Sequence, residues 1–209
     1  MRSLALILAA VALAVSACDS GSDSSADQEP GPGQDTTPVE PVGSGKHYTK
    51  AQLPQLALQP ADAPRGMRYT KEASGRMSLA DVGFILEEQL AEIRSLGVKG
   101  IFDSTFDARK TDLRLASRLW LFGDADAAQQ WLEKTERDSQ QFAFQPLTAP
   151  DLGEDSWAGR GNLAAEVVTY AFRAGNLVVV TSYTTQTEKL SESAALAAAQ
   201  KAADRIAKT

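Results

Sequence analysis

The stretch that decides the fold is GIFDSTFDARKTDLRLASRLWLF, residues 100–122. Polar residues at 109–112 divide it into two runs, 100–108 and 113–122, and the second run has leucines at alternate positions. Alternation of this kind places successive side chains on opposite faces of a β-strand. We therefore predict a β-hairpin whose two strands are joined by a four-residue loop.

Two charge pairs predict the register of this hairpin. With four residues in the loop, Asp107 lies opposite Arg114 and Asp103 lies opposite Arg118. Opposite charges that face each other across an antiparallel pair stabilise it by ~0.2–1 kcal/mol per pair. Because one register satisfies both pairs, we predict that register.

A second hairpin is predicted from residue 163 to residue 185. Its strands are placed at 163–173 and 177–185, with the turn at Ala174-Gly175-Asn176. The run NLVVVTSY, residues 176–183, is β-branched and almost wholly apolar. Such a run fits a strand with neighbours on both sides, so we place it at the centre of the sheet.

Three amphipathic helices are predicted around the hairpins, because apolar residues recur there at intervals of three and four. Each helix follows a Ser or Asp that can cap it, and they span about 78–97, 124–141 and 191–208. A short strand near 67–71 completes the order β-α-ββ-α-ββ-α. This order predicts an α+β domain with an antiparallel sheet of about five strands and three helices packed against it.

Residues 46–209 are predicted to form this single globular domain. The chain has 27 acidic and 21 basic residues, of which six acids and no base fall within residues 18–45 and one base is Arg2. The domain itself therefore carries 21 acidic and 20 basic residues and is almost neutral. We expect no nucleic-acid binding, because that function needs a basic excess.

The N-terminus has the pattern of a secretory signal peptide, predicted over residues 1–17. Arg2 supplies a positive charge, and residues 4–15 are all Leu, Ala, Ile or Val. A helix of this length is ~18 Å long, whereas a bilayer core is ~30 Å thick. A cleaved leader is therefore favoured over a membrane-spanning helix.

Val15-Ser16-Ala17-Cys18 resembles the lipobox of bacterial lipoproteins. The resemblance implies that Cys18 carries palmitate-type acyl chains after cleavage of the leader, which would anchor the protein to the cell membrane outside the cytoplasm. Two or more acyl chains anchor firmly, at ~0.8 kcal/mol per buried methylene. The alternative is an ordinary signal peptide with a chance cysteine.

The segment from Cys18 to residue 45 is predicted to be a disordered tether. It is rich in Ser, Gly, Pro and acidic residues and has almost no large apolar side chain, so it cannot bury enough surface to offset its chain entropy. A flexible chain of this length spans ~30 Å.

Two short motifs of the domain resemble exported actinobacterial lipoproteins of sensor-like type. They are LQPADAPRGM at 58–67, with a Pro-x-Gly turn after Asp62, and LGEDSW at 152–157. The Leu that usually precedes the Pro-x-Gly turn is Ala63 here. The element order also resembles the Mog1/PsbP-type α-β-α sandwich. Neither resemblance brings a catalytic residue.

The residue types of the domain exclude several chemistries. Its only histidine, His47, lies beside the tether, and it has no cysteine. Catalysis by Cys-His or Ser-His-Asp and His/Cys zinc sites are therefore excluded, and no phosphate-binding glycine motif is present. We predict no catalytic residue, no metal and no cofactor; carboxylates such as Glu154 and Asp155 leave an enzyme as an alternative.

Four residues are predicted to contact a ligand. Trp157 is placed in a Gly-rich loop, with Arg160 close by, because loops often carry function. Tyr170 and Tyr183 are placed on strand faces that would line a cavity if the last helix stood off the sheet. The alternatives are packing of Trp157 over a sheet edge and a filled core around the tyrosines.

These observations favour a membrane-tethered, extracytoplasmic, non-catalytic binding or sensing domain. Its predicted partners are the bilayer, through acylated Cys18, and an unknown small molecule or envelope protein. An accessory subunit that packs on another envelope protein is the second hypothesis. A carboxylate-dependent enzyme is the third.

Overall fold

The computed structural model describes residues 45–82, 87–162, 164–187 and 189–209. The predicted signal peptide, Cys18 and almost all of the predicted tether lie outside these residues. No helix in the described part of the chain is both long and apolar enough to cross a bilayer.

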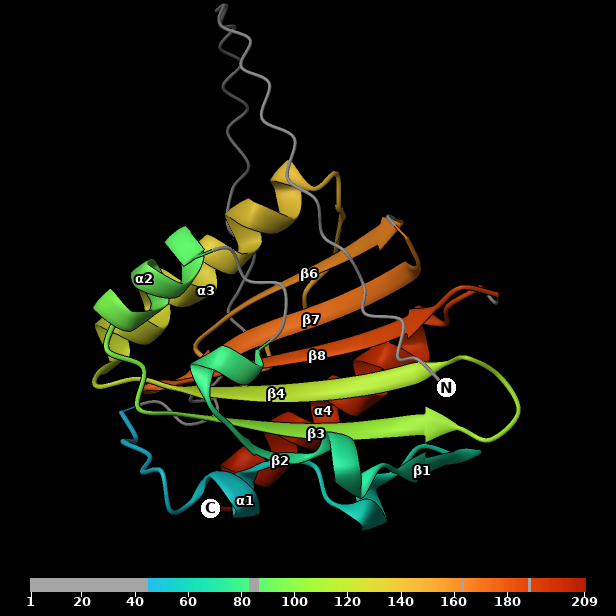
Figure 1. Cartoon of the computed structure of the whole chain (residues 1–209), viewed down its shortest axis with the longest axis horizontal. Coiled ribbons are helices and arrows are strands. Elements are labelled where there is room, and N and C mark those ends of the chain that lie inside the picture. The colour runs from blue at the N-terminus through green and yellow to red at the C-terminus, as the bar shows by residue number, and fades with distance from the viewer. Residues whose placement is uncertain (1–44, 83–86, 163, 188) are drawn as a thin grey trace, which may run out of the picture.

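One antiparallel sheet forms the centre of the molecule (Figure 1). Its strands are β1 (Met67–Tyr69), β2 (Gly75–Met77), β3 (Gly100–Ala108), β4 (Arg114–Leu121), β5 (Gln145–Leu147), β6 (Asp155–Asn162), β7 (Glu166–Ala174) and β8 (Leu177–Thr185). The order across the sheet is β1-β3-β4-β8-β7-β6-β5, and β2 also pairs with β3. The central position of β8 confirms the prediction made from its β-branched run.

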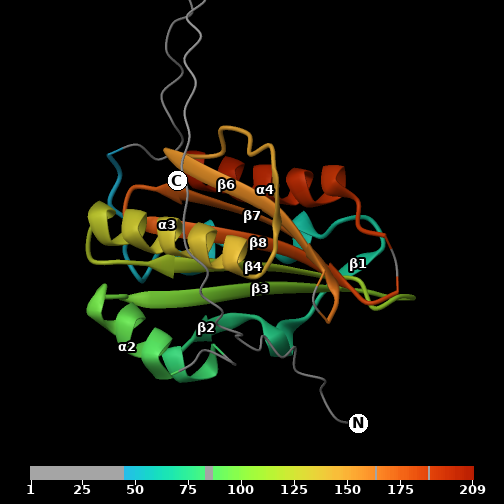
Figure 2. The same ribbon diagram turned by 90° about the horizontal axis from the view of Figure 1, so that it is seen from above.

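The described helices cover both faces of this sheet. They are α1 (Leu53–Leu56), α2 (Glu87–Ser95), α3 (Ala125–Gln141) and α4 (Glu192–Ala207), with 3₁₀ turns at Pro60–Asp62, Lys71–Ala73 and Leu79–Asp81. Helix α4 covers one face, and α2 and α3 lie over the other (Figure 2). Helix α1 packs beside α4. Each face has its own hydrophobic core. The α+β class is as predicted.

The first hairpin has the predicted register. Asp107 pairs with Arg114 and Asp103 with Arg118 across β3 and β4. Each arginine Nε lies 2.7 Å from a carboxylate oxygen of its partner. The Asp103 side chain is almost fully buried, so Arg118 also neutralises a charge that would be costly to leave alone.

The predicted number of strands was wrong, since the sheet has eight strands and not five. The short strand predicted near 67–71 corresponds to β1, which ends at Tyr69, so the strands absent from the prediction are β2, β5 and β6. Two of these, β2 and β5, have only three residues each, too few to show an alternating pattern. The predicted count of three helices also omitted α1, which has a single turn.

The strand β6 was predicted to be a loop because it contains Gly159 and Gly161, and glycine is depleted in strands. The structure gives the reason for these glycines. A Cβ atom on Gly161 would come within 2.4 Å of the Phe144 ring, and one on Gly159 within 3.2 Å. The glycines therefore let Phe144 lie against the strand, and they mark a close approach rather than a loop.

Helix boundaries agree with the capping predictions at two of three places. Asp124 caps α3 by accepting from the Ala127 N–H, and Ser191 caps α4 by accepting from the Ala194 N–H. The predicted helix at 78–97 differs: Ser78 and Asp81 form the predicted capping box on a 3₁₀ turn, and the described part of α2 runs from Glu87 to Ser95. Residues 83–86, between the two, are outside the described part.

Candidate functional site

Helix α3 is held on its face of the sheet by an aromatic cluster. Its buried residues include Ala128 and, one helical turn later, Trp131 and Leu132. The Trp131 ring lies 5.0 Å from the ring of Trp120 and 6.3 Å from that of Phe122, both from the β4 region. Tilted aromatic pairs at such distances are favourable beyond the apolar area that they bury.

Trp157 connects β6 to α3. The structure corrects its predicted place: it is a residue of strand β6, not of a loop, and it is only 8% exposed. Its indole Nε1–H donates to the Thr135 hydroxyl at 3.0 Å, and that hydroxyl donates to the Leu132 carbonyl. Trp157 therefore sets the distance between α3 and the sheet.

An apolar groove of about 340 Å³ opens beside this contact. Its walls come from α2 and α3 and its floor from β6, β7 and β8. The lining residues are Ile93, Trp131, Lys134, Thr135, Asp138, Ser139, Phe142, Trp157, Thr169, Val180 and Ser182. A mainly apolar concavity of this size with few polar groups is typical of small-molecule sites. We take it as the candidate functional site.

The charges at the groove are concentrated at its helical wall. The Lys134 ammonium lies 3.1 Å from a carboxylate oxygen of Glu92 and 3.1 Å from one of Asp138. Burial lowers the pKa of Lys134, but bonds and charge from the two carboxylates outweigh this and raise it above its ordinary value. Lys134 therefore stays protonated and ties α2 to α3.

Replacing Trp157 by Phe is expected to lower the free energy of unfolding by ~1–2 kcal/mol, because a hydrogen bond to Thr135 and part of the ring contact are lost. Urea unfolding of the variant measures this. Thr135→Val removes the same bond from the other side, so the double variant should lose less than the sum of the two. Strict additivity would contradict the proposed contact.

The other predicted ligand residues lie on the opposite face of the sheet from Trp157. Tyr170 and Tyr183 are buried in the core that α4 covers. Burial raises the pKa of Tyr183 to about 12, and burial, with the charge of Glu192, also raises that of Tyr170. Tyr183 pairs with Val168 across β7 and β8.

Arg160 is engaged in holding the start of α4. Its guanidinium lies 3.0 Å from a Glu192 carboxylate oxygen and 3.4 Å from one of Glu166, and it donates to the Leu190 carbonyl at 3.0 Å. The four residues predicted to contact a ligand are thus divided between the two faces of the sheet, with Trp157 alone at the groove.

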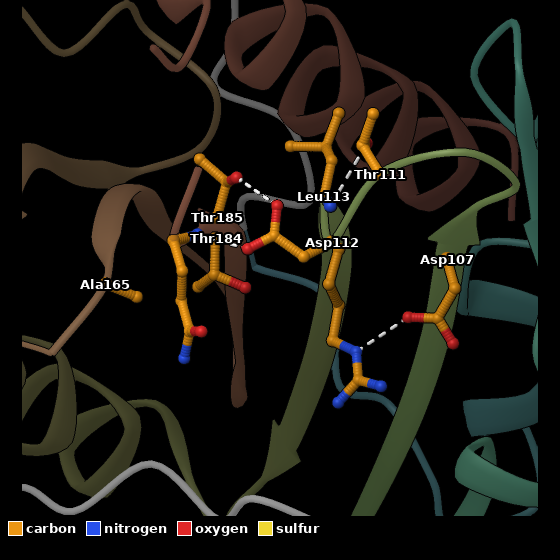
Figure 3. Close-up of a pocket in the computed structure, with 9 residues that line it drawn as sticks. Asp107, Thr111, Asp112, Leu113, Ala165, Thr184 and Thr185 are labelled. Atoms are coloured by element: carbon orange, nitrogen blue, oxygen red, sulfur yellow. Dashed lines mark hydrogen bonds and ion pairs between the residues drawn. The ribbon is translucent and has the colours of Figure 1, made fainter. Parts of the chain in front are cut away.

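A second depression lies at the loop end of the β3–β4 hairpin (Figure 3). Asp112 accepts bonds there from the Thr185 hydroxyl at 2.7 Å, the Thr187 hydroxyl at 2.6 Å and the Gln186 N–H at 2.5 Å. The carboxylate thereby ties the hairpin loop to the end of β8. We therefore interpret this depression as a structural contact between the hairpin loop and β8.

The pKa of Asp112 is predicted to be about 2, lowered first by the Thr187 and Thr185 hydroxyls and then by the Gln186 N–H. A lowered pKa means that this carboxylate stabilises the fold above the unfolded pKa, near 4, and that its contribution is lost as the pH falls toward 2. Carboxyl ¹³C NMR titration measures the value. Thr187→Val should raise it, and an ordinary value near 3.8 in the parent would contradict the bonding described.

The carboxylates considered for catalysis are also engaged. Glu154 forms an ion pair with Arg173, which also pairs with Asp155 at 2.7 Å and donates to Gln129 at 2.8 Å. Among the described residues, no group of three or more His, Cys, Asp or Glu side chains is arranged to hold a metal ion.

The fold has a solved counterpart. The structure is similar to the extracellular domain of PknH from Mycobacterium tuberculosis, with a TM-score of 0.56 and 14% sequence identity over 78% of this chain and 99% of that one. The two share a fold. This agrees with the predicted resemblance to exported actinobacterial sensor-like proteins at the level of architecture. No protein-family model and no curated protein sequence matches the chain.

Proposed function

We propose that this protein is a non-catalytic binding or sensing domain held at the outer side of the cell membrane by acylated Cys18. The groove between α3 and the sheet is its proposed ligand site. The supporting observation is the lining of this groove, in which Phe142, Val180 and Trp157 present apolar surface among six polar residues. Similarity in fold to an extracellular domain supports the extracytoplasmic placement.

The proposed absence of catalysis follows from the side chains present. The domain lacks the residue pairs of common nucleophilic catalysis, and Glu154 and Asp155 both pair with Arg173. A binding role needs only shape and an apolar lining, and the groove supplies both.

Native mass spectrometry of the protein purified from its own cells tests the binding proposal. We expect a bound small molecule, seen as a constant excess over the mass of the acylated chain. Ser182→Phe, which places a ring on the groove floor, should abolish the excess, whereas Asn162→Ala, at the exposed end of β6, should keep it. A parent protein without any such excess would contradict the proposal.

Metabolic labelling with an alkyne analogue of palmitate tests the anchor separately. The parent protein should take up label and fractionate with membranes, whereas Cys18→Ala should do neither. Absence of label from the parent, together with its release into the soluble fraction, would contradict the anchor and leave the groove proposal standing.

A further inference from the structure

The structure also indicates the charge of the ligand, an inference that depends on the groove being a binding site as proposed above. We propose that the groove takes an uncharged apolar molecule that ends in a hydroxyl or carbonyl group, and that it discriminates against anions such as fatty acids.

The first argument is the charge balance at the helical wall. Lys134 is the only cation among the residues that line the described groove, and two carboxylates, from Glu92 and Asp138, lie 3.1 Å from its ammonium. Its side chain is 14% exposed. A ligand carboxylate would therefore meet an excess of negative charge, with the one ammonium already paired.

An amine ligand is disfavoured by the same cluster. At Asp138, a ligand ammonium would compete with Lys134, whose ammonium already contacts both oxygens of that carboxylate. Such competition would remove a partner from an ammonium whose side chain is only 14% exposed, which is costly. A ligand without charge avoids both conflicts.

The second argument is the polar pair on the floor. The Thr169 and Ser182 hydroxyl oxygens lie 2.9 Å apart on neighbouring strands, and either can donate. The bond between them uses one of their two hydroxyl hydrogens, so the pair can also donate to a ligand oxygen or accept from a ligand hydroxyl. These uncharged hydroxyl groups suit a ligand whose polar end is an uncharged hydroxyl or carbonyl group. The Trp157 indole and the Thr135 hydroxyl bond to each other.

Three ligands of one length and different charge test this inference: 1-decanol, decanoate and decylammonium at pH 7.5. Each displaces N-phenyl-1-naphthylamine, an uncharged fluorescent probe, from residues 18–209 carrying Cys18→Ser, which removes the leader and any acyl group. We expect decanol to bind at least about tenfold more tightly than decanoate or decylammonium, a difference that the charge of one group commonly produces.

A double variant tests the cause. Glu92→Gln with Asp138→Asn leaves Lys134 unneutralised, so affinity for decanoate should rise about tenfold while that for decanol changes about threefold or less. Glu136→Gln, an exposed change elsewhere on α3, is the matched control and should alter neither.

The outcomes separate the two proposals. If the probe and all three ligands fail to bind, the groove is not an apolar site and the proposed function falls with this inference. If decanoate or decylammonium binds the parent as tightly as decanol, or if the double variant leaves the decanoate affinity unchanged, the proposed function stands and the inference about charge is wrong.

Discussion

Replacing Asn176 by Ala is expected to destabilise the domain by about 3–6 kcal/mol, because three buried hydrogen bonds lose a partner at once. Its Oδ1 accepts from the Tyr48 N–H at 2.7 Å, and its Nδ2 donates to the carbonyls of Tyr48 at 3.1 Å and Phe122 at 3.0 Å. The side chain is only 1% exposed. Water cannot replace the lost bonds without opening this end of the molecule.

The same bonds join the N-terminal segment to the β7–β8 turn, at positions 128 residues apart in the chain. The Tyr48 amide should therefore exchange its hydrogen much faster in Asn176→Ala, before the sheet amides do. Urea unfolding followed by hydrogen exchange measures both effects. Asn162→Ala, the other asparagine of the chain, is exposed and should change stability by ~0.5 kcal/mol or less. An equal decrease in the free energy of unfolding of Asn176→Ala and Asn162→Ala would contradict this account.

Gly153→Ala is expected to cost ~3 kcal/mol or more, at the upper end of overpacking effects. A Cβ atom at this position would lie 2.1 Å from the Arg173 carbonyl oxygen and 3.0 Å from the Phe172 ring. The neighbouring Glu154 N–H donates to that same carbonyl at 2.9 Å. Backbone cannot move aside as a side chain does, so the start of β6 would detach from β7.

Gly123→Ala is the matched control for this prediction. A Cβ atom there meets the end of Lys99 at 3.4 Å and the Gly97 carbonyl oxygen at 3.9 Å, both ordinary contacts, and its exposed position makes the change about neutral or slightly stabilising. Thermal unfolding of both variants measures the contrast. A Gly153→Ala protein as stable as Gly123→Ala would show that β6 does not pack on β7 as described.

The hairpins could be predicted because their signals are local. The pairs Asp103–Arg118 and Asp107–Arg114 lie within a short stretch of sequence and predict the same register. The structure has that register. The missed strand β6 shows the limit of such signals. Its Gly159 and Gly161 have a reason only once Phe144, from the α3–β5 connection, lies over them, and that contact is tertiary.

The candidate site could be predicted only in part, for a related reason. Trp157, predicted to contact a ligand, lies at the groove, but Trp131 and Phe142 join it only when α3 docks on the sheet. The separation of Tyr170 from Trp157 follows from pairing: Trp157 is opposite Ala171, and adjacent residues of a strand point to opposite faces. Because Trp157 was predicted to lie in a loop, the alternation of faces along a strand could not be used to place its side chain.

Methyl NMR of the chain with 1-decanol tests the central claim, that the ligand occupies the groove between α3 and the sheet. The account predicts that signals of Ile93 and Val180, which line the groove, shift on titration while those of Val168 and Leu177, in the core beneath α4, stay in place. Shifts confined to Val168 and Leu177 would put the ligand beside Tyr170 and Tyr183 and contradict the account.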